Sequence, residues 1–481
     1  MRNGKGLSSM LKTLCKLLKY SIPSILILLF LWSFILARSA AMVFNYAMER
    51  QDLLRGTITV ERIEANILGD VEFEDLKWID DHGGTILHIP EGSFHVRPWD
   101  IITWNLKSTT LQELTIKNAL VSVHFDDHMN VDFVRHSPGL KKIDDTEPNW
   151  EDKVSLTGKS EEERRIIGER RRLRNQEKLE NQWQNFNHKG HRFRLNFHLE
   201  NCLMEIFYRE RQYYLSGVYF NTNIDSDRSV SLKAYTGRFG GTMIGSGMTI
   251  HGDIDLTREP VPECNLAVLL QDVQPASLGF GLNIQDAITL QTYFTGPISH
   301  PVANGTLSMD RLHLPGMEFE NVRGDVHYED ALLDFHDVSA NVYGGTLKAD
   351  GDYNIDTRYY HIHGLGKDLR ASKAFRGAGL SCPVDMEIHL VSNEQSRDLK
   401  CYGNFTSGPG RYEWIPFDKI SGRFSNAYRD LRFYDARIDI GHYQLQTDFI
   451  SIIDGKLTLH PVDLINMETG EIRMTYEHPE R

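Results

Sequence analysis

The chain has 481 residues, of which 41% are hydrophobic and 10% aromatic, so it is long for one compact core and too apolar to be wholly disordered. Its formal net charge of −13 argues against nucleic-acid binding, which would need a surplus of Lys and Arg. The sequence contains no GxSxG, HExxH, P-loop or dinucleotide-binding glycine motif. We therefore predict no catalytic residue, no cofactor and no enzymatic activity.

The first 44 residues have the pattern of a membrane anchor. A Lys- and Arg-containing segment, residues 1–19, precedes an uncharged run from Tyr20 to Ala37, and apolar character resumes after Arg38. The basic flank predicts a cytoplasmic N-terminus, a transmembrane helix over residues 20–44, and the rest of the chain across the membrane. A cleaved signal peptide is the alternative, but the bulky aromatic residues within the run favour a retained anchor.

Residues 45–136 form the first predicted module. Apolar and polar residues alternate in Thr57–Ile63, Val71–Trp78 and Val121–Phe125, and a period of two indicates strands with one buried face. Asp80–Gly84 supplies a turn before a further strand that begins at Thr85. We expect a small β module here.

Residues 137–190 are predicted to be an insertion made of a polar loop and one long helix. Ser160 and Glu163 form a capping box, and a helix should run from there to about His188 before Gly190 ends it. Four arginines lie between residues 170 and 174, which permits contact with anionic lipid headgroups or a partner. A solvated helix along the sheet edge is the alternative that we favour, because charge runs on long helices are usually exposed to water.

Residues 191–481 are predicted to be a repetitive β array. Phe319–Asp337 aligns without a gap with Phe417–Asp435, and Tyr343–Gly351 matches Phe239–Gly247. Recurrence over about 100 residues is typical of repeated supersecondary units. The segments 239–247 and 343–351 each contain a glycine pair, Gly240-Gly241 and Gly344-Gly345. We interpret these pairs as bulges or tight bends, because strands flank them and no helix follows.

The strands of this array have one apolar and one polar face. Phe193–Leu199, Met248–Leu256 and Val384–Leu390 all alternate, and helical periodicity is nearly absent after Gly190, so we expect antiparallel β structure throughout. The sequence is compatible with two arrangements of these apolar faces. Stacked sandwiches would turn each apolar face into ordinary core, whereas a single curved sheet would leave an apolar trough.

The stretch ITVERIEANILGDVEFEDLKWIDDHGGTILHI, which follows the predicted membrane helix, resembles the opening of AsmA and TamB family proteins. The matching features are Leu68-Gly69, the strand Val71–Leu76 and the turn Asp81–Gly84. The glycine-rich segments 239–247 and 343–351 resemble strands that recur in this family. The resemblance covers about half of the chain, and no TamB-type C-terminal domain is recognisable, so no specific partner known for that branch is implied.

The resemblance implies a fold and a function. AsmA-like proteins belong to the envelope of diderm bacteria and are related in architecture to chorein-type bridge-like lipid transfer proteins. The implied fold is mostly β: an elongated, curved antiparallel sheet that forms a repeating, taco-like groove, with one N-terminal transmembrane helix and one long inserted helix. The implied role is to bind phospholipid tails in that groove and to support lipid transport between the inner and outer membranes. The implied location is the inner membrane, with most of the chain in the periplasm and a periplasmic or outer-membrane protein as a further partner.

Residues on the apolar faces of the alternating strands are the candidates for contact with lipid tails. They are Val121, Val123, Phe125, Leu195, Phe197, Met248, Ile250, Leu333, Phe335, Met386, Ile388, Leu390, Leu431 and Phe433. For any single one of them, ordinary core is the alternative.

Two other functions are compatible with the sequence. The first is a non-enzymatic scaffold or regulator of envelope assembly with closed β-sandwich domains. The second is an anchored metal-dependent hydrolase that uses His124, His128 and Asp132. We expect no metal site, and we interpret His361 and His363 as part of a solvated polar face. The cysteines lack CxxC spacing, and large β arrays do not need disulfides, so we favour free thiols over a Cys382–Cys401 bridge.

Overall fold

The computed structural model describes Asn45 and residues 56–66, 68–103, 110–125, 156, 158–188, 194–208, 211–278, 284–314, 317–377, 379–392, 399–454 and 456–477. The predicted transmembrane helix, residues 20–44, lies outside this part of the chain. Among the helices of the described residues, none combines the length and the apolar character needed to cross a membrane. The described structure is mostly β, as predicted, and the four cysteines in it are free thiols.

The chain divides into two compact units. We call residues 1–142 with 190–237 the N-terminal unit, and residues 143–189 with 238–481 the C-terminal unit. The structure thus groups residues 190–237 with the first module, whereas the sequence pattern assigned residues 191–481 to one array. Strand β9 (Ser229–Gly241) contains the boundary.

The N-terminal unit is a curved mixed sheet with one short helix. Its elements are β1 (Thr57–Thr59), β2 (Arg62–Ala65), β3 (Asp70–Ile79), β4 (Thr85–Val96), α2 (Pro98–Ile102), β5 (Leu111–Lys117), β6 (Leu120–Phe125), β7 (Arg194–Tyr208) and β8 (Arg211–Asp225). The expectation of antiparallel pairing throughout is wrong here, because β7 pairs in parallel with both β5 and β6. Parallel neighbours need a long connection, and residues 126–193 between β6 and β7 provide one.

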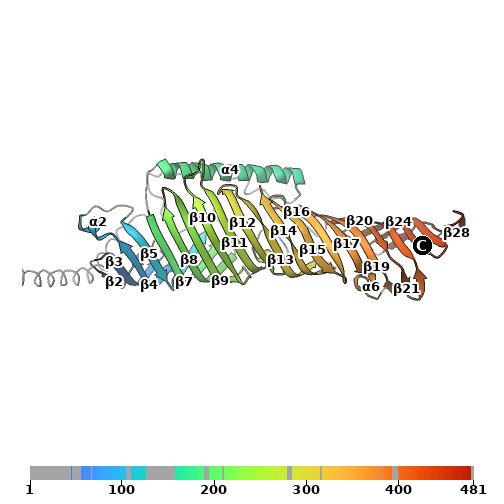
Figure 1. Cartoon of the computed structure of the whole chain (residues 1–481), viewed down its shortest axis with the longest axis horizontal. Coiled ribbons are helices and arrows are strands. Elements are labelled where there is room, and N and C mark those ends of the chain that lie inside the picture. Colours follow the sequence, from blue (N-terminus) through green and yellow to red (C-terminus); the bar gives the residue numbers. More distant parts are fainter. Residues whose placement is uncertain are drawn as a thin grey trace, which may run out of the picture. The chain divides into compact units, whose positions relative to one another are not determined.

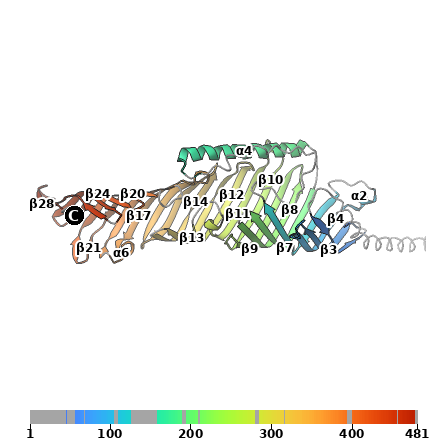
Figure 2. The same ribbon diagram turned by 180° about the vertical axis from the view of Figure 1, so that it is seen from behind.

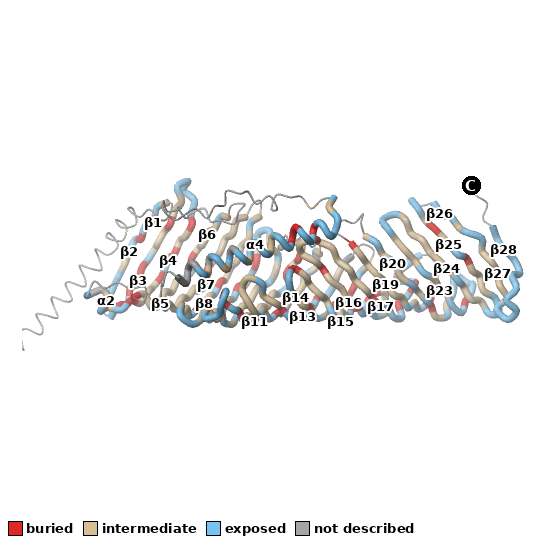
Figure 3. Tube along the Cα trace, turned by 90° about the horizontal axis from the view of Figure 1, so that it is seen from above, coloured by how far each residue is buried: buried red, intermediate tan, exposed pale blue. Residues whose placement is uncertain are grey.

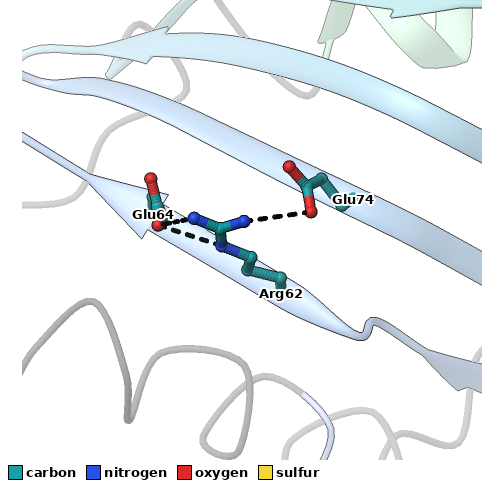
Figure 4. Close-up of polar contacts among 3 residues, drawn as sticks. All are labelled: Arg62, Glu64 and Glu74. Carbon is teal, nitrogen blue, oxygen red and sulfur yellow. Dashed lines mark hydrogen bonds and ion pairs between the residues drawn. The ribbon is translucent and has the colours of Figure 1, made fainter.

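Strand β3 illustrates how this sheet separates its two faces. Phe73 is buried in a cluster with Val60 and Ile89. Its neighbour Glu74 lies on the other face, where Arg62 of β2 contacts both Glu64 and Glu74 (Figure 4). These ions are more than half exposed, so the pairs contribute little stability and mainly keep this face soluble.

The C-terminal unit contains one long helix and a large sheet whose strands pair antiparallel (Figures 1 and 2). Its helices are α4 (Glu161–His188), α5 (Pro275–Leu278) and α6 (Ala371–Ala374). Its large sheet comprises β10 (Gly247–Asp255), β11 (Glu263–Val273), β12 (Ile288–Pro297), β13 (Val302–Leu314), β14 (Met317–Glu329), β15 (Leu332–Val342), β16 (Gly345–Asn354), β17 (Tyr360–Arg370), β19 (Pro383–Ser392), β20 (Lys400–Ser407), β23 (Lys419–Ala427), β24 (Asp430–Ile440), β25 (Tyr443–Ile453), β26 (Lys456–Leu459), β27 (Val462–Asn466) and β28 (Ile472–Tyr476). A small separate sheet is formed by β18 (Leu380–Ser381), β21 (Gly410–Tyr412) and β22 (Ile415–Phe417).

Aspartates in the left-handed backbone conformation interrupt several strands of the large sheet. Asp272, Asp337, Asp368 and Asp435 have φ angles of 51°, 50°, 55° and 50°, and the strand register shifts beside each of them. Such β-bulges bend a strand and increase its twist. Two of the repeat's aligned positions, Asp337 and Asp435, are therefore equivalent bulges, which explains why the repeat includes an aspartate there.

The bulge at Asp337 allows a direct test of this backbone requirement. We expect Asp337→Val to lower the free energy of unfolding by about 1–2 kcal/mol, because a β-branched residue fits poorly at a positive φ angle. Asp337→Gly should change it by less than about 1 kcal/mol, because glycine adopts this conformation freely. Urea denaturation of the two variants measures both effects. Equal decreases in the free energy of unfolding would instead indicate that the aspartate side chain, and not the backbone conformation, stabilises the bulge.

Helix α4 begins with the predicted capping box. The backbone N–H of Ser160 donates to Glu163 Oε2 at 2.9 Å, and the backbone N–H of Glu163 donates to Ser160 Oγ at 3.3 Å. The helix lies along the ends of the strands from β10 to β16 in both side views (Figures 1 and 2). The prediction of a long capped helix over this segment is confirmed.

Three residues of α4 dock onto the turn between β16 and β17. Arg164 is only 3% exposed, and its Nη1 donates to the carbonyl of Thr357 at 3.0 Å. Arg172 forms an ion pair with Asp356, and the buried Gly168 lies against the same aspartate. Burial raises the pKa of Asp356 even though Arg172 opposes the shift. The helix is thus attached to the sheet by specific contacts as well as being exposed along its other side.

Candidate functional site

The large sheet of the C-terminal unit has one apolar and one polar face, and β19 shows the division clearly. Met386, Ile388 and Leu390 point to the apolar face, whereas the residues between them, Glu387 and His389, belong to the polar face. Register carries this division across the neighbouring strands: Leu390 lies between Ile362 of β17 and Cys401 of β20.

A continuous row of cross-strand partners follows the apolar face from β10 to β25, and we call it the apolar lane. Its members are Ile250, Val268, Thr292, Gly305, Val326, Phe335, Gly351, Ile362, Leu390, Cys401, Asn426, Leu431 and Ile452. With strands about 4.8 Å apart, the lane is roughly 58 Å long measured along the sheet. Its side chains are apolar apart from Thr292 and Asn426.

Glycine and cysteine fit the lane for different reasons. A Cβ atom at Gly305 would lie 2.0 Å from the carbonyl oxygen of Gln291, so only glycine permits this approach of the two strands. Cys401 is a free thiol whose pKa burial raises to about 11, so it stays protonated at neutral pH and acts as a small apolar group.

The bulges divide the apolar face into a packed part and a more open part. Met309, Phe319, Val322, Ala340 and Val342 lie on the packed side and are all less than 9% exposed. Beyond the bulge at Asp337, Leu333 and Phe335 are only partly buried. The same sheet therefore supplies its own core on one side of the bend and leaves apolar side chains accessible on the other.

A pocket of about 360 Å³ opens on the accessible part of this face. It is lined by Leu290, Thr292, Phe294, Pro301, Ala303, Val326, Tyr328 and Leu333. Thr292 and Val326 are also members of the apolar lane, so the pocket is a deeper section of it. Figure 3 shows partly buried residues along much of these strands.

Three phenylalanines continue the apolar surface toward β24. The ring centroids of Phe405 and Phe433 lie 6.2 Å apart in an edge-on arrangement, and those of Phe405 and Phe424 lie 6.4 Å apart. Phe424 and Phe433 are direct cross-strand partners. Aromatic pairs of this kind add to the stability of a sheet while keeping its surface apolar.

All of the candidate residues predicted from the sequence are partly buried, neither fully packed nor fully exposed. Four of them, Ile250, Phe335, Leu390 and Leu431, are brought together in the apolar lane. Five more lie in the same sheet beside the lane: Met248, Leu333, Met386, Ile388 and Phe433. The remaining five belong to the N-terminal unit, where Val121, Val123 and Phe125 pair with β7, and Leu195 and Phe197 pair with β8.

Sequence reasoning missed several members of the site. Val326 and Ile362 lie on strands whose alternation was visible, and Val268 lies in a continuous apolar run of β11. The register that aligns these three residues with the predicted ones could not be read from the sequence. The pocket residues Leu290 and Phe294 belong to an alternating apolar series of β12 that begins at Ile288 and is interrupted by Thr292. The alternation of each strand was therefore the available clue, and the pairing of strands was the missing information.

The proposed hydrolase site gains no support from the described residues. His124 is exposed and stacks on Phe207 with ring centroids 4.3 Å apart. His128 and Asp132 lie outside the described residues. The aromatic stacking explains the position of His124 without a catalytic role.

Comparison with known proteins identifies no relative of this chain. No family model, no curated protein and no solved structure matches the chain. The apolar lane, the pocket and the chemistry of their residues are therefore the features from which a function can be inferred.

Proposed function

We propose that this protein binds phospholipid tails on its apolar lane and supports the transport of phospholipids between two membranes. The observation that carries the proposal is a continuous apolar row along the sheet, roughly 58 Å long, whose large side chains are mostly only partly buried. An ordinary core would bury such residues. A surface that only faced water would not place apolar side chains at successive positions across so many strands.

Lipid transfer along such a row needs no catalytic group. Exposing an acyl chain to water costs about 25 cal/mol per Å² of apolar surface, which amounts to many kcal/mol for a whole phospholipid. A continuous apolar surface removes most of this cost at every point along the path. The polar face and its ion pairs keep the other side of the sheet in water.

The membrane location is part of the same proposal. In it, residues 20–44 anchor the chain in the inner membrane of a diderm bacterium, the rest lies in the periplasm, and the protein belongs with AsmA- and TamB-like proteins. The apolar run of residues 20–37 and the similarity of residues 58–89 and of the glycine-rich repeats to that family support this location. The proposal also includes one elongated, taco-like groove and a periplasmic or outer-membrane partner protein.

Site-specific photo-crosslinking along β19 tests the proposal. A photoreactive amino acid is placed in turn at Met386, Ile388 and Leu390 on the apolar face, and at Asp385 on the polar face of the same strand. We expect phospholipid adducts at the three apolar positions and none at Asp385, measured by mass spectrometry after irradiation in cells.

The outcomes separate lipid binding from the scaffold alternative. Adducts with other proteins at all four positions, or no lipid adduct at any of them, would favour a non-enzymatic scaffold or regulator of envelope assembly. Equal lipid capture on both faces would indicate nonspecific contact with membrane and would also contradict the proposal.

A further inference from the structure

A cluster of two histidines and one glutamate lies on the polar face, opposite the apolar lane. His363 of β17 and His389 of β19 are direct cross-strand partners, and Glu387 precedes His389 by two residues on the same face. His363 Nε2 lies 3.0 Å from Glu387 Oε1, and His389 Nε2 lies 3.5 Å from the same oxygen. One candidate ligand atom from each residue falls within 4.8 Å of the other two.

We propose that His363, Glu387 and His389 form a binding site for Zn²⁺. Tetrahedral zinc with bonds of about 2.0–2.1 Å holds its ligand atoms about 3.3–3.4 Å apart. The two short separations in the cluster, 3.0 Å and 3.5 Å, bracket that spacing. The candidate nitrogen atoms of the two histidines lie within 4.8 Å of each other, so a side-chain rotation that brings these nitrogens closer would complete the site.

The surroundings of the cluster fit a metal site. Asn404 Nδ2 donates to Glu387 Oε2 at 2.8 Å, which orients the carboxylate and leaves Oε1 directed at the two imidazoles. The ring of His389 stacks between His363 and Tyr402, with centroid distances of 4.6 Å and 5.0 Å. These contacts restrict the rotation of the ligands before any ion binds.

The chemistry of the three groups selects the ion. Two imidazoles with one carboxylate suit Zn²⁺, whereas Mg²⁺ and Ca²⁺ prefer oxygen ligands alone. The three side chains are 41%, 38% and 37% exposed, so an ion can reach them from solvent and keep a fourth position for water.

The site can be tested on the full chain, purified with an affinity tag that lacks histidine. Zn²⁺ is titrated by isothermal calorimetry into the wild-type protein and into His363→Gln, Glu387→Gln and His389→Gln. The matched control is His361→Gln, because His361 lies on the same strand and face as His363 but pairs with Asp352, at 3.3 Å, in place of the cluster. Mg²⁺ is titrated in parallel.

We expect one Zn²⁺ equivalent that each cluster variant loses and the His361→Gln control keeps, and no binding of Mg²⁺ at the same concentrations. Asn404→Ala should weaken Zn²⁺ binding by about tenfold or more, because it releases the glutamate from its orienting hydrogen bond. Failure of the wild type to bind, or equal binding by the control and all three variants, would overturn the assignment. Lipid crosslinking at β19 does not depend on either outcome, so the two proposals fail separately.

Discussion

Replacing Ile388 with aspartate should reduce phospholipid capture by the protein at least tenfold. Ile388 is a partly buried residue on the apolar face, with Gly364 and Gly403 as its cross-strand partners. An unpaired carboxylate in contact with acyl chains costs several kcal/mol, and about 1.4 kcal/mol already corresponds to a factor of ten. The measurement is the amount of phospholipid crosslinked to a photoreactive residue at Leu390, relative to the wild type.

A matched variant tests whether the added charge must lie on the apolar face to have this effect. Thr406→Asp introduces the same group on the neighbouring strand β20, but on the opposite, exposed side of the sheet. It should leave lipid capture unchanged. If Ile388→Asp captured as much phospholipid as this control, the apolar face would not be the lipid path.

Gly168→Ala should release α4 from the sheet, although alanine normally stabilises a helix by about 1 kcal/mol relative to glycine. A Cβ atom at this position would lie 2.3 Å from Cβ and 2.4 Å from Cγ of Asp356. The helix would have to move away, and the contacts of Arg164 and Arg172 with the β16–β17 turn would be lost with it. We expect hydrogen exchange of the α4 amides to become at least tenfold faster.

Glu169→Ala serves as the control for this variant, because Glu169 is the exposed neighbour of Gly168. Its helix should exchange no faster than that of the wild type. Slower exchange in Gly168→Ala, as expected for an isolated solvent-exposed helix, would show that Asp356 does not pack against this position. The comparison thus measures docking separately from helix propensity.

The aspartate bulges connect the repeat in the sequence to the shape of the site. A strand that bends at Asp337 can pack Ala340 and Val342 on one side of the bend and present Phe335 on the other. Repetition of the bulge at Asp272, Asp368 and Asp435 continues the same division along the sheet. The accessible apolar face is therefore a consequence of backbone geometry as much as of hydrophobic composition.

The Zn²⁺ site and the apolar lane use opposite faces of the same strands. In β19, Leu390 belongs to the lane, and Glu387 and His389 belong to the cluster. An ion that joins β17 to β19 would stabilise their pairing without touching the lipid path. A β-strand can serve both purposes because successive side chains point to opposite faces.

The sequence by itself determined the local structure of this protein. Alternating residues located the strands, Ser160 and Glu163 located the start of α4, and the aligned repeats located equivalent hairpins. These features depend on neighbours a few residues apart, so periodicity and capping chemistry are enough to predict them.

Only the tertiary structure decided which strands are neighbours and how their side chains line up. Register places Phe335 beside Gly351 and Leu390 beside Cys401, and it also brings His363 next to His389. The parallel pairing of β7 with β5 and β6 was equally invisible in the sequence, because a long connection permits either direction. Strand pairing depends on contacts between distant segments, and alternation within one strand carries no information about its partner.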